Sequence, residues 1–408
     1  MEIKVFGAAG GEVTGSAYLI TTNKATVLVD AGMFQGGKES EAKNRLPEGA
    51  TPSKIDALLL THAHLDHTGR VPLLIKYGFN SPIYSTDETL KMAQIILQDS
   101  ARLQVADAMR KNRKNWKEGA PVAEPLYSSE HVEYMEVLGK PIELNTSIEV
   151  AEGITAKWIE AGHMLGSGSI EVKVTEDNKT KTIVFSGDLG PISLPLMRPF
   201  DHFDQADLVF MESTYGDRNH KSFDETIIEF EKIILEAFES GAKILVPTFA
   251  IGRAQQIIYH MADLFHSEKV APFPIYLDSP MAIKALTVYR ENQDLLDAEF
   301  HELKSKGAFP LKNEYFIPCT TAEDSKMLNE VKGPCLILAG AGMCNGGRIL
   351  HHLYHNIENP NTHILIVGYQ SYASLGRKLV EKQAVVRIFG EEKRLKAKVH
   401  TLSGFSAH

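Results

Sequence analysis

Four side chains that can bind metal stand within one short segment of the chain. His62, His64, Asp66 and His67 follow the apolar run 55–61, which has the composition of a buried strand. Imidazole nitrogen and carboxylate oxygen suit zinc, and also iron or manganese. On an extended backbone His62 and His64 point to the same side, whereas Asp66 and His67 continue into the next turn. The segment therefore predicts two metal ions side by side. A polar loop that holds histidines by chance is the alternative.

Two ions need more ligands than this segment supplies, and two later positions have the right form. His163 follows a strand-like segment and stands beside glycine, and Asp188 follows another strand-like segment in a Gly-Asp-Leu-Gly sequence. Glycine at such points permits a close approach of the backbone or a positive φ. Each position alone is more typical of a structural turn. Together with the first cluster, at successive strand ends, both are predicted metal ligands.

The elements that must position these residues change in character along the chain. The first part is rich in strands, the third of which ends at Asp30, and the segments 154–159 and 181–186 precede His163 and Asp188. From about residue 213, strand-like segments alternate with helical ones, which indicates a parallel α/β sheet. We predict a first domain over 1–212, an inserted second domain over 213–394, and a return to the first domain over 395–408.

Bulk properties narrow the classes of protein that fit. The chain has 408 residues, enough for two cores, and a net charge of −9, which argues against a protein that coats nucleic acids generally. A basic groove on an acidic body stays compatible with this charge, because bound cations add local positive charge. The three cysteines suggest neither a disulfide framework nor a thiolate metal site. The N-terminus resembles a strand rather than a signal peptide, and no apolar stretch reaches membrane-spanning length. We expect a reduced, cytoplasmic protein with no membrane partner.

Asp30, the His-x-His-x-Asp-His segment, His163 and Asp188 together resemble the metallo-β-lactamase fold family. The resemblance implies an α/β fold, the αββα sandwich, with a dinuclear site at the edge of its sheets. Two zinc ions are the expected cofactor, and manganese or iron would fit the same ligands. The ligands implied by position are His62, His64 and His163 for one ion, Asp66 and His67 for the other, and Asp188 as the bridge.

The second half of the chain narrows the resemblance to the β-CASP subfamily, a branch that processes RNA and DNA. Glu212 stands at a strand end before the α/β segment, and residues 404–408 read Gly-Phe-Ser-Ala-His. Between them lie two glycine-containing motifs that end in Arg253 and Arg348. The chain looks like bacterial and archaeal RNA nucleases related to the eukaryotic pre-mRNA 3′-end cleavage subunit. This implies that the inserted parallel-sheet domain is a β-CASP domain.

The resemblance implies a metal-dependent ribonuclease that hydrolyses phosphodiester bonds of single-stranded RNA. The implied nucleophile is a hydroxide that bridges two metals, and Asp66 is expected to orient it. His408, held by Glu212, is the expected general acid, because a neighbouring carboxylate favours the imidazolium form. For Glu212 considered alone, an acidic residue that merely ends a strand is the alternative.

Further residues are expected to contact the substrate. The glycine-rich segment 342–348 opens a helix, and such N-termini present N–H groups to anions, although a tight turn without a ligand is the alternative. A second loop has Ala373 and Ser374 where the branch commonly has Gly-Thr, and the serine keeps the hydroxyl. The predicted substrate-binding residues are Ser406, Ser374, Arg377 and Arg348.

Two other functions stay open at this point. One is a hydrolase of a small ester, thioester or lactam, which needs neither the insertion nor the Glu212–His408 pair. The other is a non-catalytic RNA-binding scaffold, which would not need six metal ligands. Members of the branch usually supply one more metal-binding histidine beyond the position of His408, where this sequence ends. DNA as a substrate and endo- against exonucleolytic action stay open, and the branch often forms homodimers.

Overall fold

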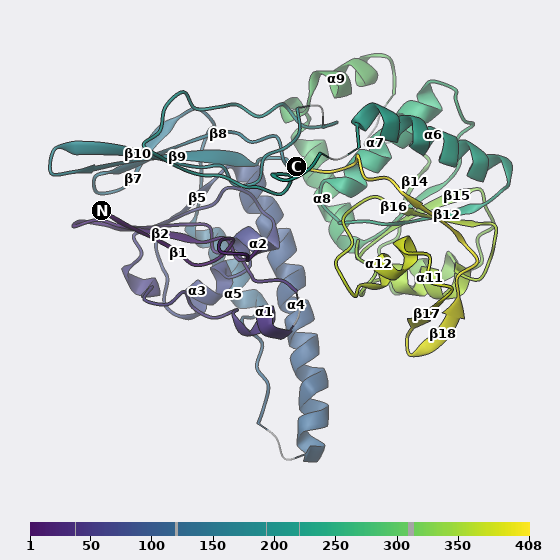
Figure 1. Ribbon diagram of the computed structural model, residues 1–408, viewed down its shortest axis with the longest axis horizontal. Helices are drawn as coiled ribbons and strands as arrows, with labels where there is room; N and C mark the ends of the chain where they lie inside the picture. Colours follow the sequence, from purple (N-terminus) through teal and green to yellow (C-terminus); the bar gives the residue numbers. More distant parts are fainter. Residues whose placement is uncertain (37, 119–120, 193, 220, 309–313) are drawn as a thin grey trace. The chain divides into compact units, whose positions relative to one another are not determined.

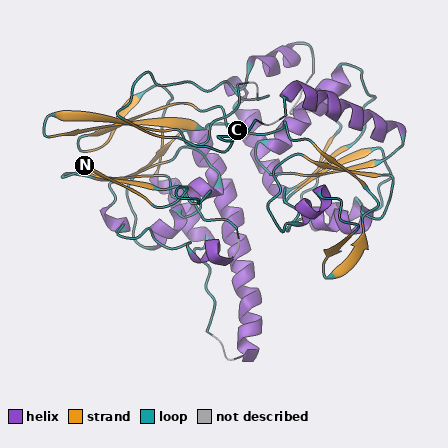
Figure 2. Cartoon of the chain, in the orientation of Figure 1, coloured by secondary structure: helices purple, strands orange, loops and turns teal. Residues whose placement is uncertain are grey.

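The computed structural model describes residues 1–408 except 37, 119–120, 193, 220 and 309–313 (Figure 1). The chain divides into two compact units. Unit 1 comprises residues 1–190 and 199–212, and unit 2 comprises residues 191–198 and 213–408. Both units combine sheets with helices, so the predicted α/β class is confirmed (Figure 2).

Unit 1 contains two sheets, and the first is mixed. Its strand order is β1-β2-β3-β4-β5-β6, with antiparallel pairing from β1 to β3 and parallel pairing from β3 to β6. The parallel strands are joined by longer connections, as parallel pairing requires. The strands are β1 (Glu2–Val5), β2 (Tyr18–Thr21), β3 (Thr26–Val29), β4 (Ala57–Leu59), β5 (Ile83–Ser85) and β6 (Gly139–Pro141).

The second sheet of unit 1 is antiparallel from β7 to β10 and adds β11 in parallel at its edge, in the order β11-β10-β9-β8-β7. The two sheets enclose a shared core, in which Val27 and Leu59 of the first sheet lie with Trp158 and Phe185 of the second. The indole of Trp158 also donates to the carbonyl of Leu60 at 3.0 Å, which ties the sheets together. The strands are β7 (Ser147–Ala151), β8 (Ile154–Glu160), β9 (Gly168–Glu176), β10 (Lys179–Phe185) and β11 (Leu208–Phe210).

The helices of unit 1 lie on the outer side of the first sheet (Figure 1). Among the described residues of this unit, no helix lies between β7 and β11, so the described elements form one helical layer and two sheets. None of the described helices is long and apolar enough to cross a bilayer. The helices are α1 (Lys38–Ala42), the 3-10 helix η1 (Pro52–Lys54), α2 (Leu65–Thr68), α3 (Val71–Lys76), α4 (Asp87–Glu118) and α5 (Ser129–Leu138).

Unit 2 is built on a parallel sheet with the strand order β14-β13-β15-β12-β16-β19. Buried aliphatic runs such as residues 335–339 form its central strands, as expected for a sheet covered on both faces. A hairpin of β17 (Val385–Ile388) and β18 (Glu391–Arg394) lies apart from it. The sheet strands are β12 (Lys243–Pro247), β13 (Ile275–Asp278), β14 (Phe316–Pro318), β15 (Cys335–Ala339), β16 (Thr362–Ile366) and β19 (Lys398–Thr401).

Helices cover both faces of this sheet, with α6 and α7 on one face and α11 and α12 on the other (Figure 1). The second face packs through Ile349, Leu353 and Leu379 against strand residues such as Leu245 and Ile364. The helical segments are α6 (Phe223–Glu239), α7 (Arg253–His266), α8 (Pro280–Glu291), the 3-10 helix η2 (Gln293–Leu295), α9 (Ala298–Ser305), α10 (Ala322–Met327), α11 (Ile349–Asn356) and α12 (Leu375–Val380).

The end of the chain departs from the sequence-based prediction. The sequence predicts that residues 395–408 return to the first domain, but β19 pairs in parallel with β16 and the whole segment belongs to unit 2. The physical reason is the open edge of β16, whose unpaired backbone groups accept one more strand in register His363 with Lys398. The predicted return is therefore corrected for this segment.

Candidate metal centre

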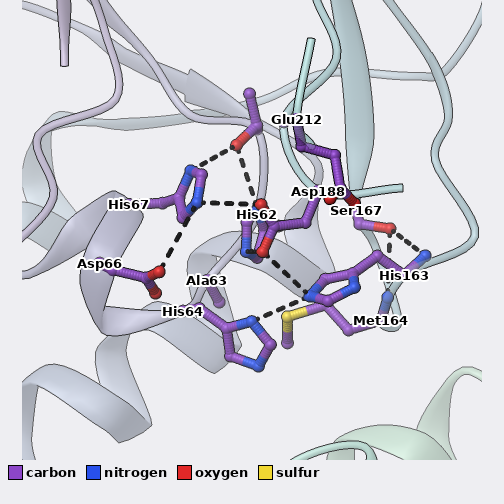
Figure 3. Close-up of polar contacts among 12 residues, drawn as sticks. His62, Ala63, His64, Asp66, His67, His163, Met164, Ser167, Asp188 and Glu212 are labelled. Carbon is purple, nitrogen blue, oxygen red and sulfur yellow. Dashed lines mark hydrogen bonds and ion pairs between the residues drawn. The ribbon is translucent and has the colours of Figure 1, made fainter. Parts of the chain in front are cut away.

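The predicted metal ligands of unit 1 all follow strands that end at one edge of its two sheets. His62 and His64 follow β4, and the short helix α2 carries Asp66 and His67. His163 comes after β8, and Asp188 comes after β10. Figure 3 shows these side chains turned toward one another. The fold therefore gathers six residues that span more than a hundred positions of the sequence. The six are His62, His64, Asp66, His67, His163 and Asp188.

Four of these side chains converge closely. Nδ1 of His64 lies 3.0 Å from Nε2 of His163. Oδ2 of Asp188 lies 3.4 Å from Nε2 of His62 and 3.5 Å from Nε2 of His163. One ligand atom from each of the four residues lies within 4.8 Å of every other. These atoms are close enough to bind one ion together.

The environment of His62 also fits a bound metal ion. Nε2 of His62 is fully buried and makes no hydrogen bond with the described residues. Its neighbour Oδ2 of Asp188 lies 3.4 Å away, and a cation bound between the two atoms would satisfy both. Three imidazoles and a carboxylate are a common donor set for zinc, and they also suit manganese or iron.

Asp188 also faces a second group of donors with its other oxygen. Its Oδ1 lies 3.2 Å from Nε2 of His67, and the same nitrogen lies 4.0 Å from Oδ2 of Asp66 (Figure 3). The two oxygens of one carboxylate therefore point to two different sets of metal-capable side chains.

A buried carboxylate behind the centre orients His67. Oδ2 of Asp30 lies 2.7 Å from Nδ1 of His67, on the ring edge opposite to the nitrogen that faces Asp188. Asp30 is fixed in turn by Thr61, whose backbone N–H and hydroxyl both donate to it at 2.9 Å. A carboxylate that receives the second N–H of a metal-binding histidine sets its tautomer and its direction.

Burial and charge put several of these groups in the forms that bind metal. Burial, with the neighbouring His67, holds the pKa of His62 well below 6.5. Burial and His163 lower the pKa of His64 to about 4. Burial opposes ionisation of Asp188, but His67 and His62 outweigh it and hold its pKa well below 3.8. Burial likewise opposes the charged form of His67, yet Asp188 and Asp30 raise its pKa well above 6.5. The neutral imidazoles of His62 and His64 and the ionised carboxylate of Asp188 are ready to accept a cation, whereas His67 must release a proton before it binds one.

Two glycines let the ligand segments approach this closely. A Cβ atom on Gly32 would lie 1.5 Å from the carbonyl oxygen of Asp66. A Cβ atom on Gly190 would lie 1.8 Å from the carbonyl oxygen of Gly162, the residue before His163. Any other residue at either position would push a metal-ligand segment away.

Glu212 takes part in the same region of unit 1. Its Oε1 accepts from the N–H of Leu189 at 3.0 Å, and its own N–H donates to Oγ of Ser186 at 3.0 Å. These two bonds fix β11 to the segment that carries Asp188. The predicted partner His408 belongs to unit 2, so the pairing of Glu212 with His408 stays a prediction.

The predicted substrate-binding residues of unit 2 have varied surroundings. Arg348 is directed inward, because its guanidinium donates to Asp278 at 2.6 Å and to the carbonyls of Cys319 and Thr320 at 2.8 and 3.0 Å. These contacts fix the guanidinium inside unit 2, and the role of Arg348 toward a substrate stays a prediction. The guanidinium is held there because the buried carboxylate of Asp278 at the end of β13 requires a cationic partner.

The other three lie on loops or helix starts. The hydroxyl of Ser374 accepts from the N–H of Arg377 at 3.0 Å and caps α12. Nε of Arg377 donates to the exposed Glu381 at 2.7 Å. Oγ of Ser406 accepts from the N–H of His408 at 3.3 Å. Their roles toward a substrate stay predictions.

Sequence reasoning missed two supporting residues of the centre. Thr61 holds Asp30, and Ser167 accepts from the backbone N–H groups of His163 and Met164 at 3.1 and 3.3 Å. Thr61 had a signal, since it directly precedes the first predicted ligand. Ser167 stands between two glycines, and nothing in that pattern distinguishes a supporting hydroxyl from an ordinary turn.

Comparison with protein families gives two matches along this chain. The profile of the Metallo-beta-lactamase superfamily matches residues 10–248, and that of the Beta-Casp domain matches residues 254–379. A crystal structure of a protein of unknown function from Enterococcus faecalis V583 shares the fold, with a TM-score of 0.53 and 13% identity. That comparison covers 98% of this chain and 88% of the other.

Two curated relatives extend the comparison. The chain is 40% identical to "Ribonuclease TTHA0252" from Thermus thermophilus, over all of this chain and 88% of that protein. It is 29% identical to "Transcription termination factor FttA" from Methanosarcina mazei, over 98% of this chain. The match spans 62% of the archaeal protein, so the chain corresponds to part of that relative.

Proposed function

This chain belongs to the metallo-beta-lactamase superfamily and contains a Beta-Casp domain, and from this we propose that it is a metal-dependent ribonuclease. The relative that carries the name ribonuclease aligns with the whole chain, including the metal centre of unit 1. We propose single-stranded RNA as the substrate, since its exposed phosphodiesters and bases are open to a protein site.

One observation carries the proposal of two metals. The two oxygens of Asp188 face two donor sets, at 3.4 Å from Nε2 of His62 and at 3.2 Å from Nε2 of His67. A carboxylate in this position would bridge two cations. The first ion would be held by His62, His64 and His163, and the second by Asp66 and His67, with Asp188 shared. When bound, such a pair acidifies water and stabilises negative charge on a phosphate during in-line displacement.

The residues of the chain would divide the remaining work. Asp66, whose side chain is 26% exposed, is open enough to hold and orient a water molecule on the substrate side. His408 is the proposed general acid for the leaving ribose oxygen, and Glu212 is proposed to hold its proton in place. The bonds of Glu212 to Leu189 and Ser186 support a second effect, because the same residue fixes the segment that bears Asp188.

The test is cleavage of a labelled single-stranded RNA, measured with metal content in the same preparations. His64→Ala should lose bound metal and cleavage together, because it removes a donor of the first set. His202→Ala, at an exposed position of the same unit, is the matched control and should change neither. Hydrolysis of small esters without cleavage of RNA would replace the ribonuclease by a small-molecule hydrolase. RNA binding without cleavage by the metal-loaded chain would replace it by a scaffold.

A further inference from the structure

Unit 2 exposes aromatic rings that the metal centre does not use. Among its described residues, the exposed Phe and Tyr side chains are Phe249, Tyr369, Tyr372 and Phe389. The first three have exposed fractions of 44%, 70% and 93%. All three stand in loops that directly follow strands β12 and β16, whereas Phe389 lies in the separate hairpin. Exposed rings that gather at one place are costly in water and mark a binding surface.

The topology of the sheet brings these loops together. β12 and β16 are parallel neighbours, so the loops after them emerge at the same edge, and β15 adds a third loop on the other side of β12. From β12 the chain passes to β13 on one side, whereas from β15 it passes to β16 on the other. The connecting helices α7 and α11 accordingly cover opposite faces (Figure 1). Open α/β sheets bind ligands at the carboxyl ends of strands where the connections diverge in this way.

Phe249 rests on glycine backbone from both neighbouring loops. A Cβ atom on Gly342 would lie 2.9 Å from its ring, and one on Gly368 would lie 3.4 Å from it. The backbone of these two glycines therefore packs against one part of the Phe249 ring. The rest of the ring is exposed to solvent.

The loop that carries both tyrosines is fastened at its base. Gln370 is buried between them in sequence, and its Nε2 donates to the carbonyl of Gly342 at 2.9 Å and to that of Gly368 at 3.1 Å. The N–H of Gly376 donates to the carbonyl of Met343 at 3.2 Å. The exposed rings of Tyr369 and Tyr372 are thus carried by a fixed backbone, which lowers the entropy lost when a ligand binds.

The segments around these rings contain neither acidic nor basic residues, so they do not repel an anionic partner. The chain carries 52 acidic and 43 basic residues, yet segments 248–252, 340–347 and 367–374 contain no Asp or Glu. Helices α7 and α11 begin at this edge and direct the positive ends of their dipoles toward it. A polyanion with flat π faces meets both requirements, and single-stranded nucleic acid is such a ligand.

We propose that Phe249, Tyr369 and Tyr372 form a base-stacking platform for single-stranded RNA. This inference rests on the proposed function and adds the part of unit 2 that holds the bases. The platform lies at the same sheet edge as Ser406 and His408, since β19 is the parallel neighbour of β16 and leads directly into them. Bases stacked there would hold the strand at the edge that carries the proposed general acid.

The platform is tested by combining substitutions of the aromatic residues with removal of bases from the RNA. Binding of a labelled 12-nucleotide RNA and of the same strand with abasic positions is measured by fluorescence anisotropy, in an Asp66→Ala background that keeps the strand intact. Tyr372→Ala and Phe249→Ala are compared with Tyr372→Phe, which keeps the ring, and with Tyr77→Ala, an exposed tyrosine of unit 1. The platform predicts that the background protein prefers the strand with bases by about 5- to 150-fold for each stacked base.

Tyr372→Ala and Phe249→Ala should each reduce this preference about fivefold or more, whereas Tyr372→Phe and Tyr77→Ala should retain it. An unchanged preference in both alanine variants overturns the platform and assigns the rings to another partner, such as a protein surface. Cleavage of the same RNA by the unaltered chain is measured alongside. If cleavage occurs and the preference is unchanged, only the platform fails; if neither cleavage nor binding occurs, the proposed function fails as well.

Discussion

Oδ2 of Asp30 lies 2.7 Å from Nδ1 of His67, while Nε2 of the same ring faces Asp188 at 3.2 Å. The ring is therefore held between a carboxylate on each side. Only one of its edges is turned to the place where a metal would bind. Asp30, which is not itself a predicted ligand, therefore sets the orientation of the ligand His67.

Asp30→Asn should weaken metal binding without removing a ligand. The amide keeps the shape but loses the charge that holds the proton on Nδ1, and such supporting partners contribute about 10- to 100-fold in metal affinity. Competition for zinc with a chelator of known affinity measures the change. Asp204→Asn, at an exposed position of unit 1, is the control, and equal affinity of the two variants would contradict the role of Asp30.

Removal of metal should lower the stability of unit 1. The buried Nε2 of His62 is without a hydrogen bond among the described residues, and a cation held by the cluster stabilises only the folded form. Thermal unfolding of chelator-treated protein should rise by several degrees on addition of zinc, and His64→Ala should abolish most of the rise. The same rise in His64→Ala would show that the stabilising ion binds elsewhere.

Gly190→Ala should destabilise the centre more than an ordinary glycine substitution. The new Cβ would meet the carbonyl oxygen of Gly162, so the segment bearing His163 must move, at a cost of about 1–3 kcal/mol for an overpacked site. Gly346→Ala is the control, since a Cβ there meets no atom within 4 Å. Chemical denaturation measures both, and equal midpoints would contradict the argument.

Unit 2 should lose stability as the pH falls below neutrality. Burial and the nearby Arg253 lower the pKa of His260 to about 3, and its Nε2 has no hydrogen bond among the described residues. Because the unfolded histidine binds a proton near pH 6.5 and the folded one does not, stability is present above that pH. It declines between about pH 6.5 and 3, by at most ~1.4 kcal/mol per pH unit for this group. His260→Phe should flatten the decline in denaturation measured from pH 7 to 4, and an unchanged slope would contradict it.

The sequence could predict the metal-ligand candidates, because histidine and aspartate directly after a strand-like segment form a recognisable local pattern. His62, His64, His163 and Asp188 stand just after strands, and strand ends at one edge bring them together without further information. The internal contacts of Arg348 could not be predicted in this way, because they depend on the buried Asp278 of a strand seventy residues away. The pairing of β19 with β16 was equally hidden, since strand composition does not say which sheet edge is open.

The central claim is that the cluster around Asp188 carries out metal-dependent cleavage of RNA. The most direct measurement is cleavage of a labelled single-stranded RNA by metal-stripped protein before and after zinc is restored, beside Asp188→Ala treated in the same way. We predict cleavage only after zinc is restored to the unaltered chain, and a rate in Asp188→Ala lower by more than about 100-fold, the most that loss of a merely supporting residue costs. Equal cleavage with and without metal, or by Asp188→Ala, would contradict the account.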